Sequence, residues 1–438
     1  MNGELVSTAL YATPLVLIWV LYARRKHRLH RESLLVREES IEAGLTEPAS
    51  LHPVIDPLRC IGCGSCVAAC PEMPGHKVLG MVRNKAELIS PTECIGHGLC
   101  RAVCPVDAIT LVFGTERRGV DIPHVKPNFE TNVPGIFIAG ELGGMGLIRN
   151  AIEQGRQAME AIASEVGRQG DEALDVVIVG AGPAGFSASL AAREKGLKTV
   201  TLEQDSLGGT VAHFPRGKLV MTAPATLPMV GKVKFTETRK EKLLGFWRKV
   251  EQDTGVEISY KERLELVSRQ GDCFEVVTTK GRYKARTILL TIGRRGTPRK
   301  LGVPGEELPK VTYHLIDPEQ YRNQRVLVVG GGDSALEAAV SISEQEGTDV
   351  TLSYRSAAFT RAKKKNRLKL EAAQENGRIR VLLSSNVQSI KPEAVLIDQD
   401  GTLHTLPNDA VIVNAGGILP TGFLKELGIE IETKRGAA

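Results

Sequence analysis

The chain has 438 residues, enough for two to four domains that each bury their own core. Its content of 42% hydrophobic and 24% charged residues is that of a globular protein, and its net charge of +5 is small and partly placed beside an apolar segment, which argues against nucleic-acid binding. Seven of the eight cysteines lie between Cys60 and Cys104. This clustering indicates metal ligands in a reducing compartment and argues against a disulfide framework.

The first predicted element is a transmembrane helix. Leu5–Ala23 carries no charged side chain and is about long enough to cross a bilayer. The sequence RRKHR follows it at residues 24–28, whereas a signal peptide would carry its positive charge before the apolar run. Residues 1–28 therefore predict a single-pass anchor in the cell inner membrane, with the cofactor domains on the cytoplasmic side. A buried globular helix is the alternative, and residues 29–52 are expected to form a helical extension and a linker.

Two cysteine runs between residues 53 and 115 have the spacing of iron–sulfur ligands. The first is C-x2-C-x2-C-x3-C-P, which wraps an iron–sulfur cube with three thiolates and lends the fourth to a neighbouring cluster. The second has identical spacing with a histidine at the second ligand position. Together they resemble a bacterial two-cluster ferredoxin domain. The resemblance implies that Cys60, Cys63, Cys66 and Cys104 hold one cluster, and that Cys94, Cys100 and Cys70, with His97, hold the other.

Three interpretations of His97 are open from the sequence. His97 ligates iron through a neutral imidazole, which should raise the reduction potential relative to a thiolate. Alternatively the site holds a 3Fe-4S cluster and His97 is a bystander, or the second cluster is absent. The preserved spacing favours the first interpretation, because imidazole is a competent iron ligand.

Residues 116–174 are predicted to contribute one strand and one helix to a flavin site. Ile136–Ala139 predicts a strand, Gly140 and Glu141 interrupt it, and Leu147–Val166 predicts an amphipathic helix. The sequence TNVPGIFIAGE resembles the segment of thioredoxin-reductase-like flavoproteins in which an acid, here Glu141, contacts the ribityl chain of the flavin. That segment comes last in the family but early in this chain, which implies a circular permutation. The alternative is a partial duplication or a chance apolar strand.

The stretch from Asp175 to Glu203 has the pattern of a dinucleotide-binding unit. An apolar strand, Val176–Gly180, leads through GAGPAG into a helix, and a second strand ends in an acid at about the usual offset of 20 residues. The glycines permit a tight turn, close approach of a pyrophosphate and close packing of helix on strand, while the acid accepts a ribose hydroxyl. The alternative is a tight turn that only packs. The predicted binding residues are Gly180, Gly182, Pro183, Ala184, Gly185 and Glu203.

The pattern recurs within residues 296–408. RVLVVGGGDSA predicts strand, turn and helix, and TDVTLSYR predicts the following strand. Arg355 stands where NAD sites place an acid, and a cation there suits the extra phosphate of NADPH over NADH. The lysines that follow Arg361 are interpreted as a solvated helix face. The predicted binding residues are Gly330, Gly332, Asp333, Ser334, Ala335, Arg355 and Arg361.

From Asp175 onward the chain resembles thioredoxin-reductase-like flavoproteins, and some details, such as GGT at 208–210, resemble the bacillithiol-disulfide-reductase-like branch. That resemblance implies that Gly209 and Thr210 lie near the isoalloxazine ring. A thioredoxin reductase needs a CxxC pair beside the flavin, and this chain has none. Ala184 stands where the bacillithiol-reductase group carries a cysteine. Electrons that leave the flavin therefore have one evident route, the iron–sulfur clusters.

These features predict an α/β protein with two Rossmann-like domains, for FAD (175–295, with a return at 409–438) and NAD(P) (296–408), a small α+β ferredoxin domain and one transmembrane helix. The expected cofactors are FAD, NADP or NAD, and two iron–sulfur clusters. We expect an NAD(P)H-dependent oxidoreductase, without a catalytic side chain, that exchanges electrons with a ferredoxin, a cytochrome or a quinone-linked membrane protein. A homodimer is compatible with the sequence. The alternatives are reduction of an organic or disulfide substrate at a flavin fed by the clusters, and a redox sensor without turnover.

Overall fold

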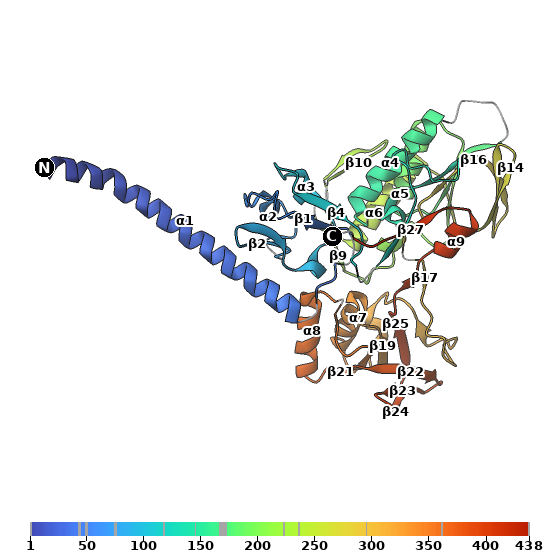
Figure 1. Ribbon diagram of the computed structural model, residues 1–438. Coiled ribbons are helices and arrows are strands. Elements are labelled where there is room, and N and C mark those ends of the chain that lie inside the picture. Colours follow the sequence, from blue (N-terminus) through green and yellow to red (C-terminus); the bar gives the residue numbers. More distant parts are fainter. Residues whose placement is uncertain are drawn as a thin grey trace. The chain divides into compact units, whose positions relative to one another are not determined.

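The computed structural model describes most of the chain: residues 2–42, 45–48, 51–73, 77–116, 119–144, 146–165, 173–221, 224–234, 237–294, 296–360 and 362–436. These residues form two compact units, and each is described by itself. The first comprises residues 1–120 and 434–438, and the second comprises residues 121–433. The cysteine runs lie in the first unit and both dinucleotide motifs lie in the second (Figure 1).

One helix of 41 residues, α1 (Asn2–Glu42), begins the first unit (Figure 1). It contains both the predicted anchor and the beginning of the predicted linker, which therefore form one element. Within the side chains that the structure describes, which start at residue 12 of this helix, no helix is long and apolar enough to span a membrane. The predicted transmembrane segment Leu5–Ala23 lies partly outside these side chains, and the structure does not support it.

The second half of α1 packs on the strand β2 (Leu79–Val82). The Ser33 hydroxyl accepts a hydrogen bond from the Met81 N–H at 3.1 Å, and a Cβ atom at Gly80 would lie 2.7 Å from the same oxygen. Lys77 Nζ donates at 2.7 Å to Glu32, the residue before Ser33 in the helix. The predicted helical extension is therefore a docked helix as far as Glu42.

The rest of the first unit consists of short elements around the cysteines. Two antiparallel pairs of strands, β1 with β4 and β2 with β3, frame them. Four of the cysteines are buried in the core of this unit, so the sulfur atoms belong to its packing. The elements besides α1 and β2 are β1 (His52–Ile55), α2 (Ser65–Ala68), β3 (Lys85–Leu88), η1 (Pro91–Glu93), α3 (Leu99–Ala102) and β4 (Ile109–Val112).

A seven-stranded sheet organises the first half of the second unit, with the order β13-β8-β7-β16-β15-β14 and β6 also paired to β16. The strands β13, β8, β7, β16 and β6 are parallel, and β15 and β14 are antiparallel additions. The continuous apolar run in β7 is explained by its central position, since a strand that is covered on both faces has no solvent face. The strands are β6 (Ile136–Ile138), β7 (Leu174–Val179), β8 (Thr199–Glu203), β13 (Ile258–Tyr260), β14 (Leu264–Gln270), β15 (Cys273–Thr278) and β16 (Arg282–Leu290).

The strand β6 comes before the dinucleotide motif in the sequence but pairs within the same sheet. Its three residues run parallel to the end of β16, with Phe137 opposite Leu289. The helix that follows, α4 (Ile148–Glu165), packs on α5 (Pro183–Glu194), the helix of the GAGPAG turn. This is the arrangement that the predicted permutation requires. Both upstream elements end within one residue of their predicted bounds.

A five-stranded parallel sheet, ordered β18-β25-β19-β20-β21, organises the second nucleotide motif, and a three-stranded antiparallel sheet, β22-β23-β24, adjoins it in the sequence. Because β25 pairs with β19, the return of the chain to the first sheet comes later than the predicted residue 409. Leu424 and Ile429 complete that return in the core beneath β6 and β7. The elements are β18 (Val311–Thr312), β19 (Arg325–Val329), α7 (Asp333–Ser343), β20 (Asp349–Ser353), α8 (Lys364–Glu375), β21 (Ile379–Leu382), β22 (Ser385–Ile390), β23 (Ala394–Gln399), β24 (Thr402–Pro407), β25 (Ala410–Val413) and α9 (Thr421–Glu426).

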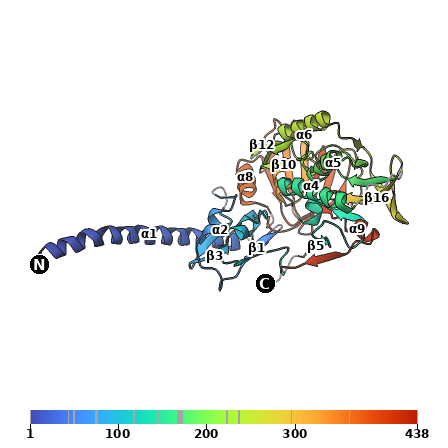
Figure 2. The ribbon, with the colours of Figure 1, turned by 90° about the horizontal axis from the view of Figure 1, so that it is seen from above.

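Short strand pairs and one further helix complete the second unit. The pair of β5 with β27 brings together two segments that are far apart in the sequence (Figure 2), and the Thr433 hydroxyl donates to Asp121 at 2.7 Å across it. The elements are β5 (Val120–Pro123), η2 (Gly140–Gly143), η3 (Gly209–Val211), β9 (Leu219–Met221), β10 (Ala225–Leu227), β11 (Gly231–Val233), β12 (Glu237–Arg239), α6 (Lys240–Thr254), β17 (Thr297–Pro298), η4 (Pro318–Tyr321), β26 (Gly417–Ile418) and β27 (Ile431–Lys434).

Candidate redox and nucleotide sites

Four cysteines from both runs line one cavity in the first unit. Cys60, Cys63 and Cys66 come from the first run and Cys104 comes from the second, which is the set that the resemblance to a two-cluster ferredoxin domain implies. The remaining wall is apolar and includes Ile55, Ala86 and Val106. A pocket with four thiols and apolar walls fits an iron–sulfur cluster, because the thiolate ligands compensate the charge of the iron and the walls need no charged side chains.

Glycines in the left-handed backbone conformation position the thiols of the first run. Gly62 and Gly64, on either side of Cys63, have φ values of 73° and 76°. A Cβ atom at Gly62 would lie 2.1 Å from the Asn84 carbonyl oxygen, so this position excludes a side chain as well as favouring glycine for its φ value. The loop therefore curls tightly enough for the thiols on either side of each glycine to face one cavity.

The second set of predicted ligands gathers elsewhere in the same core. Cys94 and Cys100 are buried, and the charge of Cys70 acts on both thiols. His97 lies beside Glu72, with 3.8 Å between its Nε2 atom and Glu72 Oε1. The structure thus groups Cys70 with the second run, as it groups Cys104 with the first.

Burial sets the ionisation of these thiols. It raises the pKa of Cys66 and of Cys94 to about 11, and the nearby charge of Glu72 adds to the shift at Cys94. Burial raises the pKa of Cys70 and Cys100 as well. The exposed Cys63 differs, because hydrogen bonds from Ser65 lower its pKa. A bound metal must therefore compensate the cost of ionising most of these thiols, since the thiolate is the ligand.

The number of thiols that line the cavity is the number that an iron–sulfur cube takes, one at each iron. Among the described residues, no three Cys, His, Asp or Glu side chains converge closely enough to hold one metal ion. An iron–sulfur cube is larger than an ion and takes one thiolate at each iron, so its ligands stand further apart. The cavity between Cys60, Cys63, Cys66 and Cys104 therefore fits the group that the sequence predicts.

The GAGPAG turn has the tight geometry that its glycines predict. Gly180 has a φ value of 100°, and a Cβ atom at Gly185 would lie 1.8 Å from the Gly180 carbonyl oxygen. Gly182 precedes α5, whose first residues are Pro183 and Ala184. The free N–H groups at this end of the helix suit a pyrophosphate. The Thr291 hydroxyl, which the sequence did not indicate, donates a hydrogen bond to the backbone of this turn.

Glu203 lies at the end of β8, where the sequence places it. One carboxylate oxygen accepts the Ala181 N–H at 2.7 Å and the other accepts the Asp205 N–H at 2.8 Å. Glu203 is buried, so these bonds fix its carboxylate beside the turn. Each oxygen keeps a second lone pair, which is the acceptor that a ribose hydroxyl requires.

The upstream segment meets the GAGPAG turn directly. A Cβ atom at Gly140 would lie 2.8 Å from the Ala184 Cβ atom, and one at Gly155 of α4 would lie 2.0 Å from the Ala184 carbonyl oxygen. The Gly140 N–H donates to the Gln154 side chain at 2.9 Å. Gly155 and Gln154 were not predicted, and a glycine inside an amphipathic helix is the one sequence signal that could have indicated the contact.

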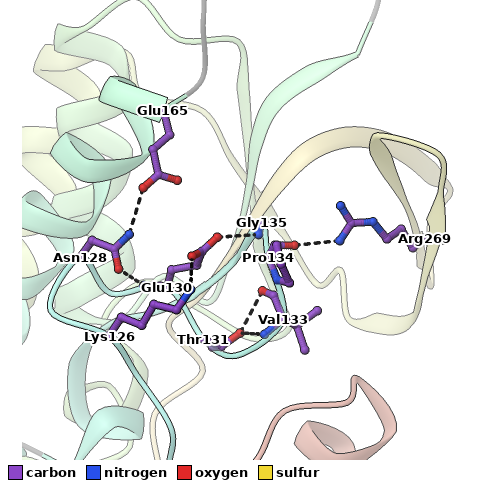
Figure 3. Close-up of polar contacts among 9 residues, drawn as sticks. All are labelled: Lys126, Asn128, Glu130, Thr131, Val133, Pro134, Gly135, Glu165 and Arg269. Carbon is purple, nitrogen blue, oxygen red and sulfur yellow. Dashed lines mark hydrogen bonds and ion pairs between the residues drawn. The ribbon is translucent and has the colours of Figure 1, made fainter.

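A cluster of polar contacts holds the loop that enters β6 (Figure 3). Glu130 accepts the Gly135 N–H at 3.0 Å and the Lys126 ammonium at 2.7 Å. The Arg269 guanidinium donates to the Pro134 carbonyl at 3.0 Å from the opposite side of the loop (Figure 3). These bonds fix the turn that aims β6 into the sheet and so place Gly140 and Glu141 at its end.

The predicted flavin-contacting residues lie around the turn. A Cβ atom at Gly293 would lie 3.9 Å from a Glu141 carboxylate oxygen, so Glu141 lies beside the loop after β16. The GGT loop, residues 208–210, approaches the GAGPAG turn itself: a Cβ atom at Gly209 would lie 3.0 Å from the Gly182 Cα atom. Thr210 follows in the short helix η3. Three segments that are separate in the sequence thus meet at one place. Each of them contributes a glycine there: Gly140, Gly182 and Gly209.

The second glycine turn leaves space where a phosphate is expected. Gly330 has a φ value of 145°, and a Cβ atom there would lie 2.4 Å from the Asn414 carbonyl oxygen. A Cβ atom at Gly332 would meet no described atom within 4 Å, so the entrance to α7 is open. Asp333 accepts the Lys363 N–H and the Asn366 amide, both at 2.8 Å. Ser334 is exposed on the first turn of α7, and Ala335 is buried beneath the turn.

Arg355 is exposed two residues after the end of β20. The residue between them, Tyr354, stacks on Phe359 and lies so close to the turn that a Cβ atom at Gly331 would be 2.3 Å from its ring. The aromatic pair was not predicted, and it places a flat surface beside the open end of α7. Arg361 lies outside the described residues, so its predicted role stays a prediction.

Comparison with known proteins decides the family. A family model described as pyridine nucleotide-disulphide oxidoreductase matches residues 177–437, which is more than half of the chain. The chain belongs to this family. A second model, described as a 4Fe-4S dicluster domain, matches residues 52–105. The protein is therefore an FAD- and NAD(P)H-dependent oxidoreductase with a 4Fe-4S ferredoxin domain, as the sequence predicts.

Relatives of this oxidoreductase include ferredoxin–NADP reductases and bacilliredoxin reductases. A ferredoxin–NADP reductase of Ignicoccus hospitalis is 28% identical over 59% of this chain and 83% of its own length. The bacilliredoxin reductase Bdr of Bacillus subtilis is 28% identical over 59% of this chain and 82% of its own. The solved bacillithiol disulfide reductase Bdr of Staphylococcus aureus has a TM-score of 0.52 and 25% identity, and covers 59% of this chain and 80% of its own.

Proposed function

We propose that this oxidoreductase passes electrons between NADPH and a one-electron redox partner through FAD and two iron–sulfur clusters. The observation that carries the proposal is the cavity lined by Cys60, Cys63, Cys66 and Cys104, in a chain that also contains both nucleotide turns. The relatives named ferredoxin–NADP reductase support it, because that name describes transfer between NADP and an iron–sulfur carrier.

The cysteine inventory supports electron transfer over disulfide reduction. Besides the seven cysteines of the first unit, the chain has Cys273, which is buried in β15 of the second unit. Dithiol exchange needs an accessible thiolate, and Cys273 does not provide one. When bound, the nicotinamide would supply a hydride, the flavin would supply the exchange between one hydride and two single electrons plus a proton, and the clusters would supply one-electron transfer. The opposite direction uses the same residues.

The chain's own residues hold and orient these groups. The GAGPAG turn and Glu203 bind the FAD dinucleotide, and Glu141 and the GGT loop border the flavin. The second glycine turn binds the NADPH pyrophosphate. Arg355, exposed beside the Tyr354 ring, is the cation that we assign to the extra phosphate. Cys94, Cys100 and Cys70, with His97, hold the second cluster: the three cysteines belong to the core of the first unit, and His97 lies beside Glu72.

We propose that α1 attaches this chain to the cell inner membrane and that its physiological partner lies there, on the cytoplasmic side. The support is an exposed apolar stretch in α1, in which Leu15, Leu17, Ile18, Trp19 and Leu21 are more than half exposed. Basic residues 24–28 follow it and suit anionic headgroups. A ferredoxin, a cytochrome or a quinone-linked protein would receive the electrons there. Membrane flotation of the full chain against a chain that lacks residues 1–28 tests the attachment, and equal flotation of both would refute it.

Reduction of a ferredoxin by NADPH under anaerobic conditions tests the function. The full protein should turn over, and the variant Cys60→Ala should lose turnover while it still oxidises NADPH with an artificial two-electron acceptor. This pattern would show that the electrons leave through the clusters. Full ferredoxin reduction by the Cys60→Ala variant would contradict the proposal, because the flavin would then serve the partner directly.

A further inference from the structure

The two cysteine runs form an internal repeat with an offset of 34 residues. Cys60 corresponds to Cys94, Cys63 to His97, Cys66 to Cys100 and Cys70 to Cys104. The repeat extends to residues that are not ligands, since isoleucine and glycine precede both Cys63 and His97. Any difference between the halves at a matched position therefore indicates a difference between the two sites.

The backbone around His97 is the same as the backbone around Cys63. Gly96 and Gly98 have φ values of 81° and 75°, against 73° and 76° for Gly62 and Gly64. In each half the second glycine begins a four-residue helix, α3 or α2, that carries the next cysteine. His97 therefore stands on a loop built to aim its side chain as the Cys63 side chain is aimed.

A second difference between the halves accompanies the first. Val106 corresponds to Glu72 in the repeat, and Val106 lines the cavity of the all-cysteine set. Glu72 instead lies beside His97, with its side chain only 7% exposed and its Oε1 atom 3.8 Å from His97 Nε2. A carboxylate thus lies in the site that has a histidine, and an apolar side chain lies in the site that has a thiol at the matched position.

The Glu72 side chain is aimed inward by a turn and carries an orphaned atom. The Met73 N–H donates to the Cys70 carbonyl at 3.1 Å, which closes a turn with Pro71 at its second position. Within the described residues, the buried Oε1 atom of Glu72 has no hydrogen-bond donor. Leaving such an atom unpaired is unfavourable, because a buried acceptor has lost its water without gaining a donor. A buried carboxylate in this position needs a donor.

We propose that Glu72 is a positioning residue for His97 as an iron ligand. Its carboxylate accepts the Nε2 proton of His97, fixes that tautomer, and leaves Nδ1 as the nitrogen that binds iron. Histidine ligands commonly donate their second ring nitrogen to a carboxylate, which also makes them more basic. The inference rests on the second cluster of the proposed function. It requires the 3.8 Å separation to shorten to hydrogen-bond length in the loaded protein.

The matched repeat supplies the test variants. Glu72→Val gives the site of His97 the residue that the all-cysteine site has, and His97→Cys gives it the ligand of that site. We expect Glu72→Val to speed iron loss from the second cluster to a chelator about 10-fold or more when His97 is present. The same substitution in the His97→Cys background should change that rate by less than about 2-fold, because a thiolate ligand needs no orienting acceptor. Glu72→Gln, which keeps an acceptor, should retain most of the cluster.

Spectroscopy separates a ligand role from a purely structural one. Protein labelled with ¹⁵N-histidine and reduced with dithionite should show a nitrogen hyperfine coupling at the second cluster, and His97→Cys should abolish it. The signal of the first cluster reports folding of the unit in every variant. Equal acceleration of iron loss in both backgrounds would overturn the inference. A second cluster without ¹⁵N coupling would also overturn it, and so would an iron content that suffices for one cluster only. Dithionite bypasses NADPH and flavin, so failure of the proposed electron route would leave these readouts intact and distinguishable.

Discussion

Gly155 of α4 and Ala184 of α5 pack so closely that a Cβ atom at Gly155 would lie 2.0 Å from the Ala184 carbonyl oxygen. Ala184 belongs to the GAGPAG turn, and Gly155 belongs to the helix that precedes the turn in the sequence. The contact therefore joins the turn to the segment that the predicted permutation places before it. The FAD site depends on both.

The substitution Gly155→Ala should push α4 away from the turn. We expect a loss of about 1–3 kcal/mol in the free energy of unfolding, because backbone atoms cannot yield as a flexible side chain can. FAD occupancy of the purified protein should fall with it. Gly245→Ala in α6 is the matched control, since a Cβ atom there meets no described atom within 4 Å and should be neutral or stabilising by up to about 1 kcal/mol. Thermal unfolding and flavin absorbance measure both, and equal behaviour would contradict the contact.

Removal of the Glu203 carboxylate should weaken flavin binding. Glu203→Ala leaves the Ala181 and Asp205 N–H groups without their acceptor, at a cost of about 1–3 kcal/mol for each group that stays buried. Glu203→Gln keeps one acceptor oxygen and should lose less. Flavin release into dilute buffer, followed by the rise in free-flavin fluorescence, ranks the variants. Faster release from the glutamine variant than from the alanine variant would refute this account of Glu203.

The choice of coenzyme should depend on Arg355. Arg355→Ala should lower kcat/KM for NADPH by about 10-fold or more, because a charged hydrogen bond to a phosphate is worth about 1.5–3 kcal/mol. The value for NADH should change little. Arg248→Ala removes another exposed arginine, in α6, and should leave both values unchanged. A parallel decrease with both coenzymes would show that Arg355 does not read the extra phosphate.

Loss of iron and sulfide should unfold the first unit selectively. Its core contains the thiols themselves, and burial raises the pKa of Cys66 and Cys94, so without iron the loops are held by neutral thiols. Hydrogen exchange should therefore increase across residues 52–112 in chelated, reduced protein. The sheets that contain β7 and β19 should keep their protection. Unchanged exchange in the first unit, or equal loss in both units, would contradict the prediction.

The sequence predicted the features that arise from local patterns. Glycine turns, cysteine spacing and apolar strands depend on neighbours along the chain, and the bounds of β6 and α4 are right to within one residue for that reason. The sequence also predicted that Cys104 joins the first run, because the ligand exchange between two runs is part of the motif.

The features that were missed arise from contacts between distant segments. The docking of the predicted helical extension through Ser33 was missed, since its contact with Met81 has no local signature. The place of β25 depends on pairing with β19, which an apolar run alone does not specify. Glu72 was not singled out, because its significance appears only when the turn places it beside His97.

Anaerobic titration with NADPH tests the central claim most directly. The account predicts that the flavin absorbance bleaches first and that the broad iron–sulfur absorbance follows, with an EPR signal from the reduced clusters. Dithionite should then add little further signal. Flavin that is fully reduced by NADPH beside clusters that stay oxidised, although dithionite reduces them, would contradict the account.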